Sequence, residues 1–284
     1  MSSQMDIYVD AVEKAEALDQ VSTTVKPIFE KALPAGDVRN FFAGTWLGHP
    51  LHPLLTDVPI GAWTSATVLD LLGGKATRKA ADRLIGLGVL AALPTAAAGA
   101  ADWIDTWGGT QRIGVAHAAG NVTAVALFAL SYSSRKRGHR IRGVMLSLAA
   151  MGLATASAYL GGHLSFRKGV GVDTTAWEQA PEKWTPVLSA SELSDGKPVK
   201  GNAEGVDVFL LKQGRKTYAL ANVCTHRACG LHEGEVDDET VTCPCHGSTF
   251  RLEDGSIVTG PATAPAKAFD VRVKSGTVEV RLRQ

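Results

Sequence analysis

The chain has 284 residues, of which 45% are hydrophobic and 20% charged, and its formal net charge is +1. A chain of this length is expected to hold more than one domain, and the balanced charge gives no reason to expect a nucleic-acid partner. The average composition conceals two different halves. Charged residues are scarce in four long stretches between about residue 54 and residue 164, whereas the sequence beyond residue 165 resembles an ordinary soluble domain.

The first 40 residues are polar and mildly acidic, with two apolar stripes at helical spacing. The stripes consist of Ile7, Ala11, Ala15 and Leu18, and of Val25, Ile28, Phe29 and Leu33. They predict one or two amphipathic helices that lie on a membrane surface or against other helices. A partly disordered arm over residues 1–40 is the alternative. No apolar run in this segment has the form of a secretory signal.

Four apolar stretches are long enough to cross a membrane. They run near residues 54–73, 84–103, 113–133 and 143–163. Asp57 and Asp70 in the first stretch favour the alternative of a soluble helical bundle, but the other three stretches have no charged side chain in their interiors. Their many alanines and glycines suit close helix packing in lipid. We therefore predict a four-span membrane domain over residues 41–166.

Basic residues gather in two of the predicted loops, and both loops fall on the same side of the membrane. They are Lys75, Arg78, Lys79 and Arg83 after the first stretch, and Arg135, Lys136, Arg137, Arg140 and Arg142 after the third. Because short basic loops stay in the cytoplasm, this side is predicted to be cytoplasmic. Four crossings return the chain to the outer side, where we expect both termini and the whole segment after residue 165.

The segment Gly48-His49-Pro50-Leu51-His52-Pro53-Leu54 resembles the opening of an uncharacterised bacterial family of four-helix membrane domains. The resemblance covers roughly residues 35–175 and implies no established activity. Four histidines, His49, His52, His117 and His163, are predicted to lie near the outer face. Histidines on facing helices could ligate haem b or line a quinone pocket, with His117 and His163 as the preferred haem pair. Structural hydrogen bonding is the alternative, most clearly for His49 and His52, where a His-Pro step shapes the start of a helix.

Residues 167–186 are predicted to form a linker, because Gly169, Gly171, Pro181 and Pro186 interrupt it. Short β-rich runs follow at residues 206–212, 217–221, 240–242, 268–273 and 277–282. Turn signals at Gln213-Gly214 and Ser275-Gly276 separate some of these runs. The fold class is therefore a multidomain membrane protein, in which a four-helix transmembrane bundle precedes a small all-β domain at residues 187–284.

All four cysteines of the chain lie in two short segments of this last domain. The segments are Cys224-Thr225-His226-Arg227-Ala228-Cys229 and Cys243-Pro244-Cys245-His246-Gly247-Ser248. Thiolates are soft ligands that suit iron–sulfur centres, and imidazoles are neutral ligands that make such a centre easier to reduce. A zinc site of two cysteines and two histidines is the alternative, although zinc sites more often pair Cys with Cys and His with His.

The pattern Cys-x-His…Cys-x-x-His-Gly strongly resembles a Rieske [2Fe–2S] domain. The resemblance places Cys224, His226, Cys243 and His246 at the four ligand positions. It also implies a disulfide between Cys229 and Cys245, with two buried free thiols as the alternative. A stable disulfide favours an oxidising compartment. Both the disulfide and the basic loops therefore indicate that this domain is extracytoplasmic.

Three further positions are predicted by resemblance to tune the cluster. Ser248 matches a serine whose hydroxyl bonds a bridging sulfide and raises the potential. Phe250 stands where quinol-oxidising members have a tyrosine that bonds a ligand sulfur, and this difference is expected to lower the potential. Pro261, in Gly260-Pro261-Ala262, matches the proline-containing loop that covers the cluster.

The sequence therefore predicts an electron-transfer protein of the bacterial cytoplasmic membrane, with several spans and a Rieske domain on the extracytoplasmic side. The expected partners are a redox protein or a quinone, together with membrane lipid. We expect a component of an oxidoreductase rather than a stand-alone enzyme. A redox-sensing or regulatory membrane protein and a quinol-oxidising subunit of a larger complex are the alternatives. A ring-hydroxylating oxygenase would need a mononuclear iron domain, for which no soluble stretch remains.

Overall fold

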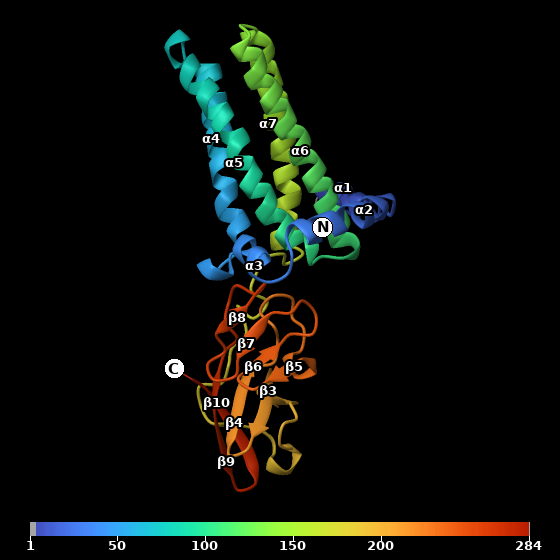
Figure 1. Cartoon of the computed structure of the whole chain (residues 1–284), viewed down its shortest axis with the longest axis vertical. Helices are drawn as coiled ribbons and strands as arrows, with labels where there is room; N and C mark the ends of the chain where they lie inside the picture. Colours follow the sequence, from blue (N-terminus) through green and yellow to red (C-terminus); the bar gives the residue numbers. More distant parts are fainter. Residues whose placement is uncertain (1–3, 284) are drawn as a thin grey trace. The chain divides into compact units, whose positions relative to one another are not determined.

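The computed structural model describes residues 4–283 and divides into two compact units, each described here by itself (Figure 1). The helical unit comprises residues 4–34 and 51–170, and the β unit comprises residues 35–50 and 171–283. A helical N-terminal region followed by a small all-β domain confirms the coarse fold class. The predicted domain boundaries at residues 40, 166 and 186 stay predictions.

The helical unit consists of two short helices, four long ones and one 3₁₀ turn (Figure 1). They are α1 (Gln4–Glu13), α2 (Ala17–Ala32), α4 (Leu51–Leu72), η2 (Lys75–Thr77), α5 (Arg78–Ile104), α6 (Gly108–Lys136) and α7 (Arg140–Phe166). Among the described residues, three helical segments are long and apolar enough to cross a membrane: Lys75–Ile104, Gly108–Lys136 and Arg140–Phe166. Four spans are thus not confirmed, because α4 is not in this set. Its Asp57, Asp70 and prolines lower its apolarity.

Helices α4 and α5 form one antiparallel hairpin, and α6 and α7 form a second with matching internal contacts. In the first hairpin, His52 Nδ1 lies 2.9 Å from the carbonyl oxygen of Thr95. In the second, His117 Nδ1 lies 2.8 Å from the carbonyl oxygen of Ser157. One turn beyond each carbonyl, a glycine makes room for the imidazole: a Cβ at Gly99 would lie 2.8 Å from His52, and a Cβ at Gly161 would lie 2.8 Å from His117.

The equivalent residues of the two hairpins also meet each other. Trp63 and Phe128 stack with ring centroids 4.1 Å apart, and Arg135 donates to both carboxylate oxygens of Asp70. His52 and His117, Trp63 and Phe128, and Asp70 and Arg135 are each 65 positions apart in the chain. The helical unit is therefore an internal repeat of one helical hairpin, which the sequence analysis did not predict.

The N-terminal helices are bound to the start of α6. Arg112 donates from Nε and Nη2 to the two carboxylate oxygens of Asp19, at 2.8 and 2.6 Å, and from Nη1 to the carbonyl oxygen of Glu13. Lys168, just after α7, forms an ion pair with Glu13 at 2.6 Å. These contacts fix α1 and α2 against the helical unit as ordered helices.

The β unit contains three antiparallel sheets with the strand orders β1-β10-β9, β2-β3-β4 and β5-β6-β7-β8. The strands are β1 (Thr185–Ser189), β2 (Val199–Ala203), β3 (Val206–Gln213), β4 (Lys216–Ala221), β5 (Glu235–Asp237), β6 (Thr240–Thr242), β7 (Thr249–Arg251), β8 (Ile257–Thr259), β9 (Phe269–Lys274) and β10 (Thr277–Leu282). Two 3₁₀ turns lie between strands, η3 (Ala190–Glu192) and η4 (Leu231–Glu233).

Strand β3 separates two apolar cores, because its side chains alternate between its two faces. Phe209 and Leu211 join a core beneath the cysteine-containing loops, whereas Val208 and Leu210 join a second core with Phe269 of β9. All five side chains are buried. A strand covered on both faces is a rigid base for the loops at the ends of its neighbours.

Two segments outside the sheets complete the β unit. The first holds helix α3 (Asp37–Ala43) and the turn η1 (Thr45–Leu47), and Thr45 hydrogen-bonds to Ala262. The second covers residues 171–184, where the Thr174 hydroxyl donates to the carbonyl oxygen of Cys224 at 2.9 Å. Lys267 adds two bonds from Nζ to the carbonyl oxygens of Thr175 and Glu178. Much of the predicted linker is therefore attached to the β unit by hydrogen bonds.

Candidate metal centre

The two cysteine–histidine segments form loops with the same backbone pattern. In the first ligand loop (residues 222–230), the N–H of Cys224 donates to the carbonyl oxygen of Cys229, five residues later, at 2.8 Å. The carbonyl oxygen of Cys224 accepts from the N–H of Ala228, four residues later, at 2.9 Å. In the second ligand loop (residues 243–248), Cys243 makes the same two bonds, at 2.8 and 3.1 Å. The first loop lies between β4 and η4 and the second between β6 and β7. Each closed turn presents a cysteine at its start and a histidine two or three residues later.

The two thiols, Cys224 and Cys243, are free and buried, with 1% and 3% of their surfaces exposed. They are hydrogen-bonded to each other. This bond and the backbone N–H groups of Cys245 and His246 hold the pKa of the Cys243 thiol at about 6, although burial opposes the change. The pKa of the Cys224 thiol is raised by the same bond and by burial. One of the two sulfurs is thus prepared to act as a thiolate, the form that binds metal.

The two imidazoles meet edge to face, with the ring centroids of His226 and His246 at 5.0 Å and the planes at 89°. Both residues are half-buried. Burial lowers the pKa of His226 to about 3, and the positive charges of His246 and Arg227 add to the effect. His226 is therefore neutral at pH 7, as a metal ligand must be. Its buried Nδ1 atom has no hydrogen-bond partner within the described part of the chain.

A disulfide between Cys229 and Cys245 joins the two ligand loops, as the family resemblance implied. The sulfurs of Cys229, Cys243 and Cys245 lie within 4.8 Å of one another. Two of these sulfurs are oxidised in the disulfide and offer no thiolate, so this trio is not a metal-binding set. The donors that remain are two thiols and two imidazoles, which is the ligand chemistry of a Rieske centre. The loops therefore fit a [2Fe–2S] cluster.

A third loop lies against the two ligand loops. Ser248 is buried, and its Oγ accepts a hydrogen bond from the N–H of Ala262 at 3.0 Å. Its hydroxyl hydrogen is therefore available to donate elsewhere. The Thr225 hydroxyl donates to the carbonyl oxygen of Ala264 at 2.7 Å, and Pro261 follows a cis peptide bond from Gly260. This proline loop (residues 260–264) is thus bonded to both ligand loops.

Phe250 lies on β7 beside the second ligand loop. Its side chain is fully buried in the core that also holds Cys224 and Cys243. The ring has no hydroxyl, so it contributes packing and no hydrogen bond at this position. The roles predicted for Ser248, Phe250 and Pro261 stay predictions.

The predicted outer histidines have different surroundings. His52 and His117 use Nδ1 to bond the backbone of the neighbouring helix, and Asn121 Nδ2 lies 3.1 Å from His117 Nε2. His49 is exposed, with Nδ1 3.2 Å from the Pro50 carbonyl oxygen, and His163 lies in the last turn of α7. Haem or quinone binding by these histidines stays a prediction.

Several contributing residues escaped the sequence analysis. Thr45 and Thr174 bond the proline loop and the first ligand loop from outside the predicted β domain. The sequence places Arg135 in a loop, but the residue belongs to the last turn of α6, where it is buried against Asp70. An unmatched acid inside the first apolar stretch was the one available signal, because a buried carboxylate requires a cationic partner.

Comparison with known proteins agrees with this geometry. Residues 183–272 match the Rieske [2Fe-2S] domain, and residues 48–174 match a predicted membrane protein family (DUF2231). Ferredoxin CarAc of Metapseudomonas resinovorans is 34% identical over 98 residues, which are 34% of this chain and 92% of that protein. The chain therefore belongs to the Rieske [2Fe–2S] family through its C-terminal domain, and this domain is fused to an N-terminal DUF2231 domain.

Two other similar proteins are a subunit of a cytochrome complex and a ferredoxin of a dioxygenase. The cytochrome b6-f complex iron-sulfur subunit of Chlorobaculum tepidum is 33% identical over 75 residues, which are 26% of this chain and 40% of that subunit. Among solved structures, the ferredoxin of carbazole 1,9a-dioxygenase from Nocardioides aromaticivorans IC177 has 26% identity and a TM-score of 0.33. That match covers 36% of this chain and 99% of the ferredoxin.

Proposed function

We propose that this protein is a membrane-anchored electron carrier, whose [2Fe–2S] cluster is held by Cys224, His226, Cys243 and His246 on the extracytoplasmic side of a bacterial cytoplasmic membrane. The observation that carries the proposal is the donor set: two buried free thiols beside a buried imidazole nitrogen that has no hydrogen-bond partner among residues 4–283. The named similarities, to ferredoxins and to an iron-sulfur subunit of a cytochrome complex, support electron transfer as the function.

The residues around the site have separable roles in this proposal. A bound [2Fe–2S] cluster accepts and donates one electron. Cys224 and Cys243 would supply anionic ligands from the buried side, and the imidazoles of His226 and His246 would supply the other two. The Cys229–Cys245 disulfide keeps the two loops together. The half-buried histidines form the edge through which a redox protein or a quinone would exchange electrons.

The anchoring part of the proposal depends on α4. This helix runs antiparallel to α5 along its length, as shown by His52 bonded to Thr95 near one end and Trp63 bonded to Ile85 further along. If α5 crosses a bilayer, α4 beside it crosses too, which supports four spans. Arg135 and Arg140 both pair with Asp70 and Asp82, so the two basic connections belong to one end of the helical unit. That arrangement supports a single cytoplasmic side.

The cluster is tested by electron paramagnetic resonance and redox titration of the full chain purified in detergent. We expect a reducible [2Fe–2S] signal with a potential within the Rieske range of about −150 to +300 mV. The signal should disappear in His226→Ala. It should persist in His232→Ala, which removes a nearby histidine outside the ligand set. The ligand assignment would be refuted if the purified protein held zinc without iron. It would also be refuted if His226→Ala and His232→Ala lost the [2Fe–2S] signal equally.

Orientation needs a separate measurement. Alkaline phosphatase fused after residue 284 is active only outside the cytoplasm, whereas green fluorescent protein fused there fluoresces only inside. The proposal expects an active phosphatase fusion and a dark fluorescent fusion. The reverse pattern would place the Rieske domain in the cytoplasm and remove the extracytoplasmic part of the proposal without affecting the cluster.

A further inference from the structure

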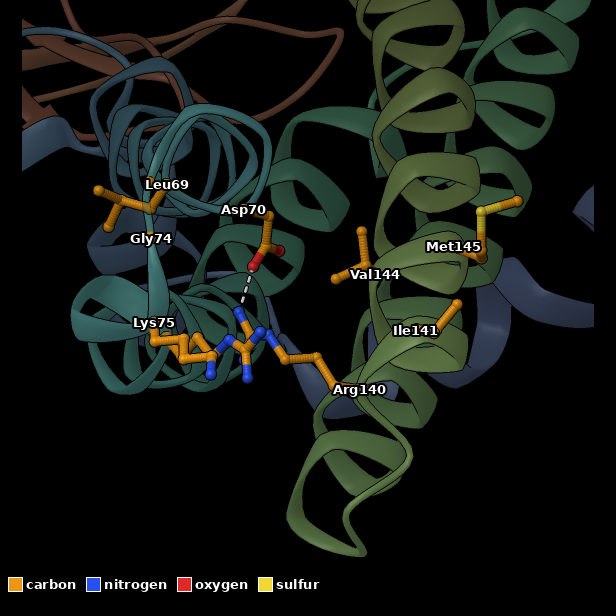
Figure 2. Close-up of a pocket in the computed structure, with 10 residues that line it drawn as sticks. Leu69, Asp70, Gly74, Lys75, Arg140, Ile141, Val144 and Met145 are labelled. Carbon is orange, nitrogen blue, oxygen red and sulfur yellow. Dashed lines mark hydrogen bonds and ion pairs between the residues drawn. The ribbon is translucent and has the colours of Figure 1, made fainter.

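A pocket of about 440 Å³ lies at the basic end of the helical unit (Figure 2). It is bounded by the end of α4, the turn Gly73-Gly74, the turn η2 and the first two turns of α7. One part of its lining is charged, with Asp70, Lys75, Arg78 and Arg140, and another part is apolar, with Leu69, Ile141, Val144 and Met145. The lining thus combines cations with an apolar wall.

The acidic groups at this end are already neutralised. Asp70 accepts hydrogen bonds from Arg135 and Arg140, and Asp82 accepts from the same two arginines. The two carboxylates and two guanidinium groups therefore form a closed set with no net charge. Figure 2 shows Asp70 bonded to Arg140 at the pocket.

Two cations of the lining remain outside this set. Lys75 and Arg78 are exposed, and no carboxylate of residues 4–283 forms an ion pair with either of them. The pocket therefore has a net positive charge of two. Such a charge calls for an anion with several oxygens, since an arginine and a lysine together favour phosphate.

The apolar wall narrows the choice of anion. Ile141 and Met145 are 83% and 64% exposed, on the first turns of α7. Inorganic phosphate would satisfy the cations but leave this wall uncovered. A phospholipid satisfies both parts, because its phosphate meets the cations at the depth of the headgroups while its acyl chains cover the apolar side chains.

We propose that this pocket binds an anionic phospholipid, with Lys75 and Arg78 contacting the headgroup phosphate and an acyl chain lying along Ile141 and Met145. The inference rests on the membrane placement in the proposed function and is independent of the cluster. It assigns the two hairpins a joint role, since α4–η2–α5 supplies the free cations and α7 supplies the apolar wall.

The test is native mass spectrometry of the full chain released from detergent micelles that contain phosphatidylglycerol or phosphatidylcholine. We expect retained phosphatidylglycerol in the wild type. The double variant Lys75→Gln/Arg78→Gln should bind it about thirtyfold more weakly, from about 1 kcal/mol for each basic residue near a lipid surface. The control Lys79→Gln/Arg83→Gln removes the same charge from the same connection, outside the pocket lining, and should bind like the wild type.

Three results would overturn the proposal. Equal weakening in both double variants would mean diffuse attraction to the basic end. Equal retention of phosphatidylcholine would mean contact with the apolar wall alone, and displacement of the lipid by millimolar inorganic phosphate would identify a soluble anion as the ligand. Failure of the membrane placement is recognised separately, because alkaline carbonate would then extract the protein from membranes while the cluster signal persisted.

Discussion

The Thr45 hydroxyl donates a hydrogen bond to the carbonyl oxygen of Ala262 across 3.3 Å, although 217 residues separate them. The N–H of the same residue, Ala262, donates to Ser248 Oγ beside the second ligand loop. A segment that precedes the long helices thus supports the proline loop of the candidate metal centre. The close contact between residues 40–45 and the proline loop requires a glycine at position 260, because a Cβ there would clash with Thr45 Oγ1 and lie 2.9 Å from Asn40 Oδ1.

This contact predicts a suppression experiment. Gly260→Ala should destabilise the β unit by about 1–3 kcal/mol, the usual cost of overpacking. Thr45→Ala alone should cost about 0.5–1.5 kcal/mol for the lost hydrogen bond. The double variant should be more stable than Gly260→Ala alone, because the smaller side chain leaves room for the added methyl group. Thermal unfolding followed by cluster absorbance measures all three, and strictly additive losses would contradict the close approach.

The cluster potential should respond in opposite directions to two substitutions. Ser248→Ala removes a hydroxyl that has a hydrogen to donate, and is expected to lower the midpoint potential. Phe250→Tyr adds a hydroxyl in the core that holds both thiols, and is expected to raise it. Tyr218→Phe, which removes a hydroxyl at the edge of the same core, is the control and should leave the potential unchanged. A shift of the same sign in both test variants would argue against hydrogen bonding as the cause.

Loss of the disulfide should destabilise the candidate centre without removing a ligand. Cys229 and Cys245 are 16 residues apart, and closing a loop of about this size contributes about 3 kcal/mol. The double variant Cys229→Ser/Cys245→Ser is therefore expected to assemble the cluster and to lose it at a lower temperature. Treatment of the wild type with dithiothreitol should reproduce this loss. A variant that keeps the wild-type unfolding temperature would show that the bond is dispensable for loop stability.

Glu178 should make the β unit less stable as the pH rises. Burial raises the pKa of this carboxyl above its ordinary value of 4.5, and the charge of Lys267 opposes the change only in part. Because the folded state favours the protonated form, stability is highest below pH 4.5 and falls as the pH rises through the folded pKa. Glu178→Gln should therefore raise the unfolding temperature at pH 7 and have little effect at pH 4. Glu182→Gln, at an exposed neighbouring position, is the control, and a gain that is the same at both pH values would contradict this cause.

The ion pair between the repeated hairpins should be important for the stability of the helical unit. The side chains of Arg135 and Asp70 are 0% and 2% exposed, and removing one partner of a buried pair typically costs about 3–5 kcal/mol. Arg135→Ala should therefore unfold at much lower denaturant in mixed micelles, and Arg135→Lys should be intermediate because lysine lacks the planar fork. Arg137→Ala changes an exposed residue at the same end and should be neutral. Equal stability of Arg135→Ala and wild type would show that the pair is replaceable by water.

The sequence was most informative where the structure is local. Each ligand loop closes through hydrogen bonds between residues four and five apart, so the spacing of Cys224 and His226, or of Cys243 and His246, already describes the turn. The disulfide partners lie inside the same two loops. Two six-residue segments could therefore predict the two closed turns and, through the family resemblance, the disulfide between them, whereas the ligand assignment stays a prediction.

Long-range pairings were not predictable in this way. In the sequence, Asp70 argues against a membrane span, because its partner Arg135 lies beyond the last apolar residue of another stretch, in a predicted loop. The hairpin repeat was also not evident, although His52 and His117 are identical equivalents. The two pairs that contact each other across the repeats differ in sequence: Trp63 corresponds to Phe128, and Asp70 corresponds to the arginine that neutralises it. Such complementary contacts reduce the sequence similarity by which repeats are recognised.

The division of the chain into units has a consequence for proteolysis. The chain passes from the helical unit to the β unit after Pro34, returns after Pro50 and passes over again after Val170. A single cut after Val170 severs one of these passages, but residues 35–50 of the β unit stay covalently joined to the helical unit at both ends. Release of the whole β unit therefore requires two further cuts, one near Pro34 and one near Pro50. After one cut, α3 and η1 still connect the β unit to the helical unit, because the chain continues from them in both directions.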